Sequence, residues 1–370
     1  MKSKLGEIAA IKGGKRLPKG VNLIKAQNEH PYIRVRDLNN RRTLELNSDY
    51  EYVDDDTHKG IARYIVDQGN ILLSIVGTIG LVAIVGKTLD KANLTENCVK
   101  IVPSDVVDKD YLYYYLKSPA GQAAIARGTV GAVQAKLPIK NIQDIDIWIP
   151  EITEQKRIAS ALSCIDEKIE QNERINDNLL QQAQAVYTER FVANADPSWP
   201  TGHLSDFVTV RYGKDHKKLS DGLIPVYGSG GLMRRVERAL YDHESVLIPR
   251  KGTLNNVIYI NEPFWSVDTM FYTEMRMPNV AKFVYHFVSS KDLASMNAGS
   301  AVPSMTTDIL NAMELQIPDQ TALADFEELV APMYRAMQEN RVQSEKLAAL
   351  RDALLPRLMS GEIDVSDVQI

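Results

Sequence analysis

Residues 77–88, GTIGLVAIVGKT, have the glycines and the lysine-threonine pair of a phosphate-binding loop. Such a loop needs four residues between its first glycine and Gly-Lys-Ser/Thr, so that backbone N–H groups curl around a phosphate before a helix begins. Here five apolar residues, LVAIV, separate Gly80 from Gly86, and such a run favours a strand. The sequence therefore predicts a glycine turn followed by a strand, with phosphate binding as the remote alternative.

Other patterns with catalytic residue types have simpler interpretations. The acidic run at 54–56 with His58 resembles a metal site, but a solvated acidic turn is favoured. YGSGG at 227–231 is not the Gly-x-Ser-x-Gly of a nucleophile elbow, so we expect a tight glycine loop. The sequence also has no Asn/Asp-Pro-Pro-Tyr/Phe stretch of an amino-methyltransferase and no glycine fingerprint for its methyl donor. We expect a chain that is not an enzyme, with no catalytic residue and no metal or cofactor of its own.

Basic residues are concentrated in loops that also contain Asn, Ser, Thr and Tyr. DNA-binding proteins use this mixture, because Lys and Arg bind phosphates while Arg, Asn and Gln bind base edges. For any one cluster a solvated loop is the favoured interpretation, but clusters in matching regions of both copies favour DNA binding. The Gly-Thr pairs at 77–78 and 252–253 are expected to be structural turns, although such a turn can donate to a phosphate. The residues expected to contact DNA are Lys15, Arg34, Arg36, Arg41, Lys214, Lys218, Tyr227, Arg234, Arg250, Lys251 and Asn255.

The composition indicates a globular chain of two domains. Its 370 residues exceed what one core usually organises, and 44% hydrophobic with 25% charged residues is ordinary for a globular protein. No apolar run reaches the roughly 18 residues that a membrane helix needs, and the start has no secretory pattern. Two cysteines, Cys98 and Cys164, exclude a disulfide framework or a zinc cage and favour the cytoplasm. The net charge of -5 confines DNA binding to local patches.

The chain contains one domain twice. The matching segments are 4–15 with 203–214, 76–85 with 251–260, 111–118 with 283–290, and 146–150 with 314–318. The offset falls from 199 (4 to 203) to 168 (146 to 314), so the first copy has more loop early on. A repeat of about 170 residues is much longer than a solenoid unit, which indicates two copies of one domain.

Each copy is predicted to be mainly β. Short runs of β-branched and aromatic residues end at Gly, Asn, Asp or Pro, as strands do. The expected strands include 71–75, 81–85 and 98–102 in the first copy and 245–248, 257–260 and 270–275 in the second. Helices are expected at 109–117 and 280–289.

A long helix is predicted after each copy. Thr153 and Thr321 follow IPEI and IPDQ at the same offset, and each can cap a helix start. From there, mostly apolar residues alternate at spacings of four and three, which predicts a coiled-coil seam, and helices of roughly 36 residues would be about 55 Å long. Two separate helices, each packed on its own domain, are the alternative.

Polar residues occupy the middle of both seams. They are Asn172, Asn176, Asn340 and Ser344. Antiparallel packing of the two helices would bring these polar layers face to face. A buried polar layer lowers stability but fixes the register, which suits a spacer of defined length.

Two segments at the boundaries of the long helices are distinctive sequence motifs. IPEITEQKRIASALSCIDEKIE (149–170) follows the first copy, and LLPRLMSGEI (354–363) ends the second long helix. With two β-rich copies and two long helices, the chain resembles the specificity subunit of type I restriction-modification systems over essentially its whole length. The second helix has TALADFEEL where the first has EQKRI, so its docking surface is expected to differ.

This resemblance implies an α+β fold with two mainly-β target-recognition domains and an antiparallel coiled coil. The expected boundaries are target-recognition domains at 1–152 and 203–319, spacer helices at 153–193 and 320–360, a linker at 194–202 and a tail at 361–370. Each recognition domain would bind one half of a bipartite, asymmetric site in double-stranded DNA. Recognition domains about 55 Å apart would leave an unread spacer, because that length corresponds to about 16 base pairs.

The resemblance also implies partners in the cytoplasm and no membrane. Two methyltransferase subunits would bind S-adenosylmethionine, and two restriction/translocase subunits would use ATP and Mg. The chain itself would be a non-catalytic recognition subunit and scaffold. A coiled-coil adaptor that binds only protein is the alternative function, and a stand-alone nucleotide-dependent enzyme is opposed by the missing motifs.

Overall fold

The computed structural model of the chain describes residues 2–38, 41–131, 134–296 and 304–366. It forms two compact units: residues 1–173 with 340–370 make the first unit, and residues 174–339 make the second. The ends of the expected first domain and tail, at residues 1 and 367–370, lie outside the described residues. Within the described ranges, no helix combines the length and apolarity needed to cross a membrane.

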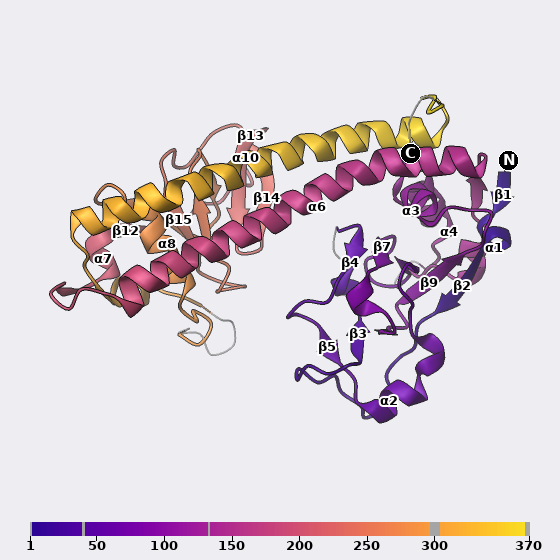
Figure 1. Cartoon of the computed structure of the whole chain (residues 1–370), viewed down its shortest axis with the longest axis horizontal. Coiled ribbons are helices and arrows are strands. Elements are labelled where there is room, and N and C mark those ends of the chain that lie inside the picture. Colours follow the sequence, from indigo (N-terminus) through magenta and orange to yellow (C-terminus); the bar gives the residue numbers. More distant parts are fainter. Residues whose placement is uncertain (1, 39–40, 132–133, 297–303, 367–370) are drawn as a thin grey trace. The chain divides into compact units, whose positions relative to one another are not determined.

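The first unit contains two sheets and an antiparallel strand pair (Figure 1). The strand orders are β2-β9-β6-β7-β4, β5-β3-β8 and β1-β10. The strands are β1 (Lys2–Lys4), β2 (Ala9–Gly13), β3 (Pro31–Ile33), β4 (Thr43–Leu44), β5 (Glu51–Tyr52), β6 (Ile71–Ser74), β7 (Val82–Val85), β8 (Asn93–Leu94), β9 (Cys98–Pro103) and β10 (Asp146–Trp148). The short helices are α1 (Leu5–Ile8), α2 (Asp55–Gly60), α3 (Lys109–Lys117), α4 (Pro119–Gly128) and α5 (Ile139–Gln143).

The second unit repeats this topology, except that its described residues have no counterpart of β4. Its orders are β12-β18-β15-β16, β14-β13-β17 and β11-β19, with the same mixture of parallel and antiparallel pairs. The elements are β11 (Thr201–His203), α7 (Leu204–Phe207), β12 (Val208–Tyr212), β13 (Asp221–Gly228), β14 (Gly231–Val236), β15 (Ser245–Pro249), β16 (Ile258–Ile260), β17 (Trp265–Ser266), β18 (Met270–Met275), α8 (Ala281–Ser289), α9 (Thr307–Asn311) and β19 (Glu314–Gln316). The sequence repeat is therefore confirmed as a structural repeat.

The falling sequence offset has a structural cause. In the first unit, β3 reaches β5 through a 3-10 helix (Val35–Asp37) and the short strand β4, which pairs parallel to β7. In the second unit, β13 and β14 are joined by a two-residue turn, Ser229-Gly230. The same sheet therefore carries an inserted segment in one copy and a tight hairpin in the other.

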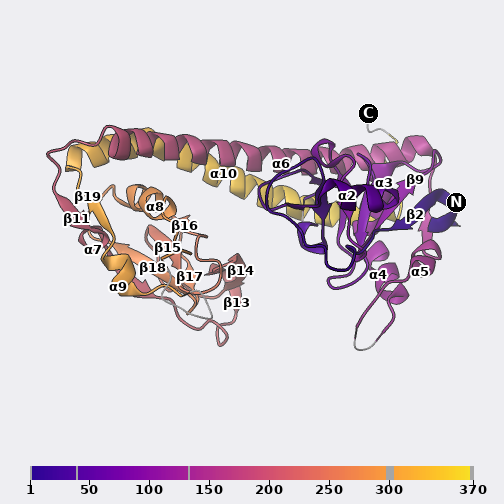
Figure 2. The same cartoon turned by 90° about the horizontal axis from the view of Figure 1, so that it is seen from below.

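Segments of both long helices, α6 (Ile152–Thr188) and α10 (Gln320–Met359), complete each unit. In the first unit, Ile158 and Leu162 of α6 and Leu358 of α10 join the core beneath the sheet. In the second unit, α8 lies between its sheet and the helix pair (Figure 2). Val365, in the expected tail, is buried in the core of the first unit, so the described part of the tail packs against that unit.

The polar seam residues face one another across antiparallel helices. In the first unit, Asn172 Nδ2 donates to Gln343 Oε1 at 2.8 Å and to Ser344 Oγ at 3.1 Å, and it lies 3.4 Å from the Asn340 carbonyl oxygen. In the second unit, Asn176 Nδ2 donates to the Met337 carbonyl oxygen at 3.2 Å. These contacts match the register expected from the seam midpoints.

The predicted helix caps were wrong by one or two residues. α6 begins at Ile152 and α10 begins at Gln320, so Thr153 and Thr321 lie inside the first turns. The Asp319 carboxylate accepts a hydrogen bond from the Ala322 N–H at 2.8 Å and caps α10. Aspartate is the stronger N-cap, and it precedes the threonine in IPDQT. At its other end, α6 continues as a π-helical turn, Glu189–Ala193.

The expected turn and strand at 77–88 are confirmed. Gly77 and Gly80 have φ values of 80° and 92°, and the residues after them form β7. The N–H groups of Lys87 and Thr88 donate to the Glu45 carboxylate at 3.2 and 2.9 Å. These two backbone donors are therefore already used within the chain.

Candidate nucleic-acid interface

A Gly-Lys pair occupies the same position at one edge of each sheet. In the first unit, Gly14 N–H donates to Cys98 O at 3.0 Å, and Lys15 N–H donates to Leu94 O at 2.8 Å. A Cβ atom on Gly14 would lie 2.0 Å from the Thr95 carbonyl oxygen. Only glycine fits this approach, so the loop holds Lys15 directly beyond the end of β2.

The second unit reproduces this arrangement atom for atom. Gly213 N–H donates to Met270 O at 3.0 Å, and Lys214 N–H donates to Ser266 O at 2.8 Å. A Cβ atom on Gly213 would lie 2.0 Å from the Val267 carbonyl oxygen. The glycine of the repeated motif is therefore structural, and the lysine side chain is exposed at equivalent positions in both copies.

The Gly-Thr turns lie at the same sheet edge as the Gly-Lys loops. In the first unit, Gly13 pairs with Val99 and Ser74 with Cys98, so β2 and β6 both end beside the start of β9. In the second unit, Tyr212 pairs with Phe271 and Pro249 with Met270. Each unit therefore has one edge where both loops meet, and Gly252 takes a φ of 85° like its counterpart Gly77 at 80°.

The edge of the first unit is hollowed by an open concavity of about 700 Å³. Four of its lining side chains have DNA-binding chemistry: Arg16, Asn97, Gln134 and Lys136. The sequence analysis did not select these four. Their proximity depends on the pairing of Val76 with Lys136, which joins the Gly-Thr turn to a loop that is distant in sequence.

The edge of the second unit gathers residues from three loops. Asn256 Nδ2 donates to Ser229 O at 2.8 Å, which ties the β13–β14 turn to the Gly-Thr turn. The Arg250 guanidinium lies over the Tyr212 ring, 5.3 Å from its centroid, and Tyr212 is 51% exposed. An exposed aromatic ring, a guanidinium and the exposed Lys251 are thus placed together.

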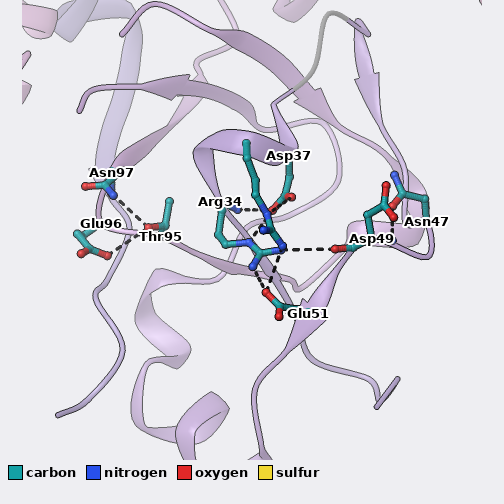
Figure 3. A network of polar contacts seen from close by, with 9 residues as sticks. Arg34, Asp37, Asn47, Asp49, Glu51, Thr95, Glu96 and Asn97 are labelled. Carbon is teal, nitrogen blue, oxygen red and sulfur yellow. Dashed lines mark hydrogen bonds and ion pairs between the residues drawn. The ribbon is translucent and has the colours of Figure 1, made fainter. Parts of the chain in front are cut away.

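Arg34 does not belong to the exposed set. Figure 3 shows its guanidinium surrounded by Asp37, Glu51 and the Asp49 carbonyl oxygen. Its side chain is 17% exposed, and its hydrogen bond lowers the pKa of Glu51. Arg34 therefore holds the inserted segment of the first unit together, while Arg36 reaches Glu51 from a more exposed position.

Four other predicted contacts have partners within the chain. Arg41 pairs with Glu173 at 3.4 Å, and Arg234 donates to Leu219 O at 2.6 Å and pairs with Asp221 at 3.3 Å. Asn255 Nδ2 donates to Asp292 at 3.0 Å, and its Oδ1 accepts from the Ala294 N–H. Tyr227 is buried in the core beneath the hairpin. Among the predicted residues, Lys15, Lys214, Lys218 and Lys251 are exposed, and Arg36 and Arg41 are also exposed although each pairs with a glutamate.

A polar contact joins α3 to the segments of the two long helices in the first unit. Tyr114 of α3 donates from its hydroxyl to Asp166 Oδ2 of α6 at 2.7 Å. Arg351 of α10 donates to the other carboxylate oxygen at 2.6 Å. Asp166 is buried, so one carboxylate connects three helices and fixes how α3 docks on them.

The equivalent contact in the second unit uses a histidine. His286 occupies the position of Tyr114 in the repeat, and Tyr334 occupies that of Asp166. The Tyr334 hydroxyl donates to His286 Nε2 at 2.9 Å, and Nδ1–H donates to Gln184 Oε1 at 2.7 Å. Burial lowers the pKa of His286 from 6.5 to about 4, so the ring is neutral at pH 7.

Because His286 is buried in its neutral form, we expect the second unit to lose stability at acidic pH. Its folded pKa lies below its unfolded pKa, so the stabilisation is complete above about pH 6.5 and is lost as the pH falls toward 4. We expect the free energy of unfolding to fall by about 2 kcal/mol between pH 7 and 5 on this account. His286→Phe should remove that part of the loss, measured by urea unfolding at both pH values. His243→Gln, at an exposed histidine, should retain it, and an unchanged pH dependence in His286→Phe would contradict the assignment.

Comparison with known proteins assigns this architecture to a class. The sequence profile of the type I restriction modification DNA specificity domain matches residues 1–181 and again residues 198–326. The chain therefore belongs to the type I restriction-modification DNA specificity family and carries its domain twice.

Individual relatives agree with this class. The type I restriction enzyme MjaIX specificity subunit of Methanocaldococcus jannaschii is 24% identical over 381 aligned residues, covering 91% of this chain and 88% of the relative. The HindI specificity subunit of Haemophilus influenzae is 29% identical over 92 residues, covering 25% of this chain and 18% of the relative. The S subunit structure from M. genitalium has a TM-score of 0.57 at 16% identity, covering 97% and 95% of the two chains, and shares the fold.

Proposed function

We propose that the two units bind the two halves of a bipartite, asymmetric site in double-stranded DNA, as the specificity subunit of a type I restriction-modification complex. The observation that carries this proposal is the repeated sheet edge, where a Gly-Lys loop and a Gly-Thr turn meet in both units. The two edges share a scaffold but differ in their inserts, so they would bind different base sequences. DNA-binding proteins commonly obtain sequence specificity in this way, from variable side chains on a fixed frame.

The partners belong to the same proposal. Two methyltransferase subunits would bind S-adenosylmethionine, and two restriction/translocase subunits would use ATP and Mg. This chain would be non-catalytic and would supply the recognition and the scaffold. The acidic total charge supports a division of labour, because much of the DNA affinity can come from the partner subunits. The chain alone is therefore expected to bind DNA weakly and in a salt-sensitive way.

Arg250 and Arg276 provide a matched test, because both arginines flank the same strand, β18. Arg250 N–H donates to the Thr269 carbonyl oxygen beside the start of β18, and Arg276 directly follows its end. In the complex with the methyltransferase, Arg250→Ala should weaken binding of the methylated site sequence, and the slope of log affinity against log salt should fall by about 0.9. Arg276→Ala should leave affinity and slope unchanged.

Equal effects of the two variants would contradict the proposed face. The alternative function, an adaptor that binds only protein, predicts that the wild-type complex distinguishes no DNA sequence. That outcome would reject the proposal irrespective of the variants.

A further inference from the structure

The hairpin of the second unit presents two consecutive apolar side chains. Strand β14 has an irregularity opposite the step from Val226 to Tyr227, where the pairing jumps from Arg234 to Leu232 and leaves Met233 as an extra residue. Leu232 is 52% exposed and Met233 is 57% exposed. In a regular strand, neighbouring side chains alternate between faces, so this bulge is what exposes both.

The turn next to these residues is held in place. Gly231 has a φ of 105°, and a Cβ atom on Gly228 would lie 2.6 Å from the Met233 sulfur. Ser229 is bound to Asn256, and a Cβ atom on Gly252 would lie 2.7 Å from Ser229 Oγ. The apolar pair therefore extends from a turn that is fastened to the Gly-Thr turn of the candidate interface.

The charges around the turn favour a polyanionic partner. Arg250 and the exposed Lys251 immediately precede Gly252, whose turn is bound to the β13–β14 turn. Arg234 and Arg235 follow the apolar pair in sequence, but their guanidinium groups contact Asp221 and the Leu223 carbonyl oxygen near the start of β13. Two exposed side chains are also too few for a stable protein interface, which buries about 800 Å² on each partner.

Among its described residues, the first unit has no equivalent of this tip. Register alignment places Ile33 and Tyr227 at the same point, because each pairs with the second residue of the neighbouring parallel strand. The next residue is Arg34 in the first unit and Gly228 in the second. Arg34 begins the polar insert described above, so the two units present different chemistry at the same place in the fold.

We propose that Leu232 and Met233 form an apolar tip that contacts bases of the half-site bound by the second unit. Their targets are the apolar surfaces that DNA offers, which are thymine methyl groups and the faces of unstacked bases. This inference rests on the proposed function and adds the chemical basis of specificity in one half-site. Arg250 and Lys251 would bind the flanking phosphates and thereby determine how far the tip enters the DNA groove.

The test uses the chain in complex with the methyltransferase and the site found by mapping its methylated positions. Binding is measured to that site and to a series in which each base pair is replaced in turn. Wild type should lose on the order of ten-fold affinity for each replaced recognition pair. Leu232→Ser with Met233→Ser should abolish that discrimination at one or two adjacent pairs of the second half-site. Discrimination in the first half-site should remain, which separates the tip from general DNA binding.

Leu223→Ser is the control, because Leu223 is 84% exposed on the same hairpin but lies near the start of β13. It should leave every position unchanged. Deoxyuridine in place of thymine will mimic the double variant if methyl groups are the target, whereas 2-aminopurine fluorescence will rise on binding if bases are unstacked. Uniformly weaker binding to all sites, or unchanged discrimination in the double variant, would overturn the inference. A wild-type complex without any discrimination would instead reject the proposed function.

Discussion

Replacing Asp166 by alanine is expected to lower the free energy of unfolding of the first unit by about 3 kcal/mol. The substitution leaves the Tyr114 hydroxyl and the Arg351 guanidinium without the carboxylate that both contact. Removing one partner of a buried ion pair commonly costs about 3–5 kcal/mol, and the lower end applies because Arg351 keeps some access to water. Hydrogen exchange of α3 peptides, which reports local opening, is the appropriate measurement.

Asp352 provides the control for this variant. It also pairs with Arg351, at 2.8 Å, but its side chain is 65% exposed. Asp352→Ala should therefore change stability by less than about 1 kcal/mol. Because Asp166 connects the recognition domain to both helices, its loss should accelerate exchange in α3 and in the adjoining part of α6. Similar exchange in the two variants would show that the carboxylate does not hold α3 in place.

Gly213→Ala is expected to disrupt the Gly-Lys loop of the second unit. The added methyl group would lie 2.0 Å from the Val267 carbonyl oxygen and 2.6 Å from that of Ser266. Both atoms belong to backbone, which cannot move aside as a flexible side chain can, so we expect a loss of about 3 kcal/mol. The same change displaces Lys214, and discrimination in the second half-site should fall with stability.

Gly230→Ala is the matched control, because a Cβ atom there has no neighbour within 4 Å. It should change the urea midpoint little. Gly14→Ala offers the reciprocal case, since its Cβ atom meets the Thr95 carbonyl oxygen at the same 2.0 Å. It should affect only the first half-site. Normal stability in Gly213→Ala would refute the structural role of the repeated glycine.

The large features of the fold were accessible from the sequence because they depend on local or periodic signals. Internal similarity identified the repeated domain, and the starts of both long helices were predicted to within two residues. The midpoints of the polar layers gave the antiparallel register that Asn172 and Ser344 adopt. Each of these inferences uses residue similarity or residue spacing, and both can be obtained directly from the sequence.

The candidate interface was less accessible, because it depends on which distant segments meet. Arg34 and Lys251 are both basic residues in loop clusters of the sequence. In the structure, Glu51 and Asp37 surround Arg34, whereas Lys251 is exposed. Tyr227 is buried in the core, although the glycine-rich turn beside it favoured the prediction of an exposed loop. Gln134 reaches the concavity of the first unit only through the pairing of the adjacent loop with the Gly-Thr turn.

The central claim is that each unit specifies one half of a split DNA site. The most direct test maps methylated bases in the genome of a host that expresses this chain with its methyltransferase. The wild-type chain should give two short sequence elements separated by unread base pairs. Replacing residues 203–319 by the corresponding domain of another specificity subunit should change one element and leave the other intact. A change in both elements, or in neither, would contradict the account.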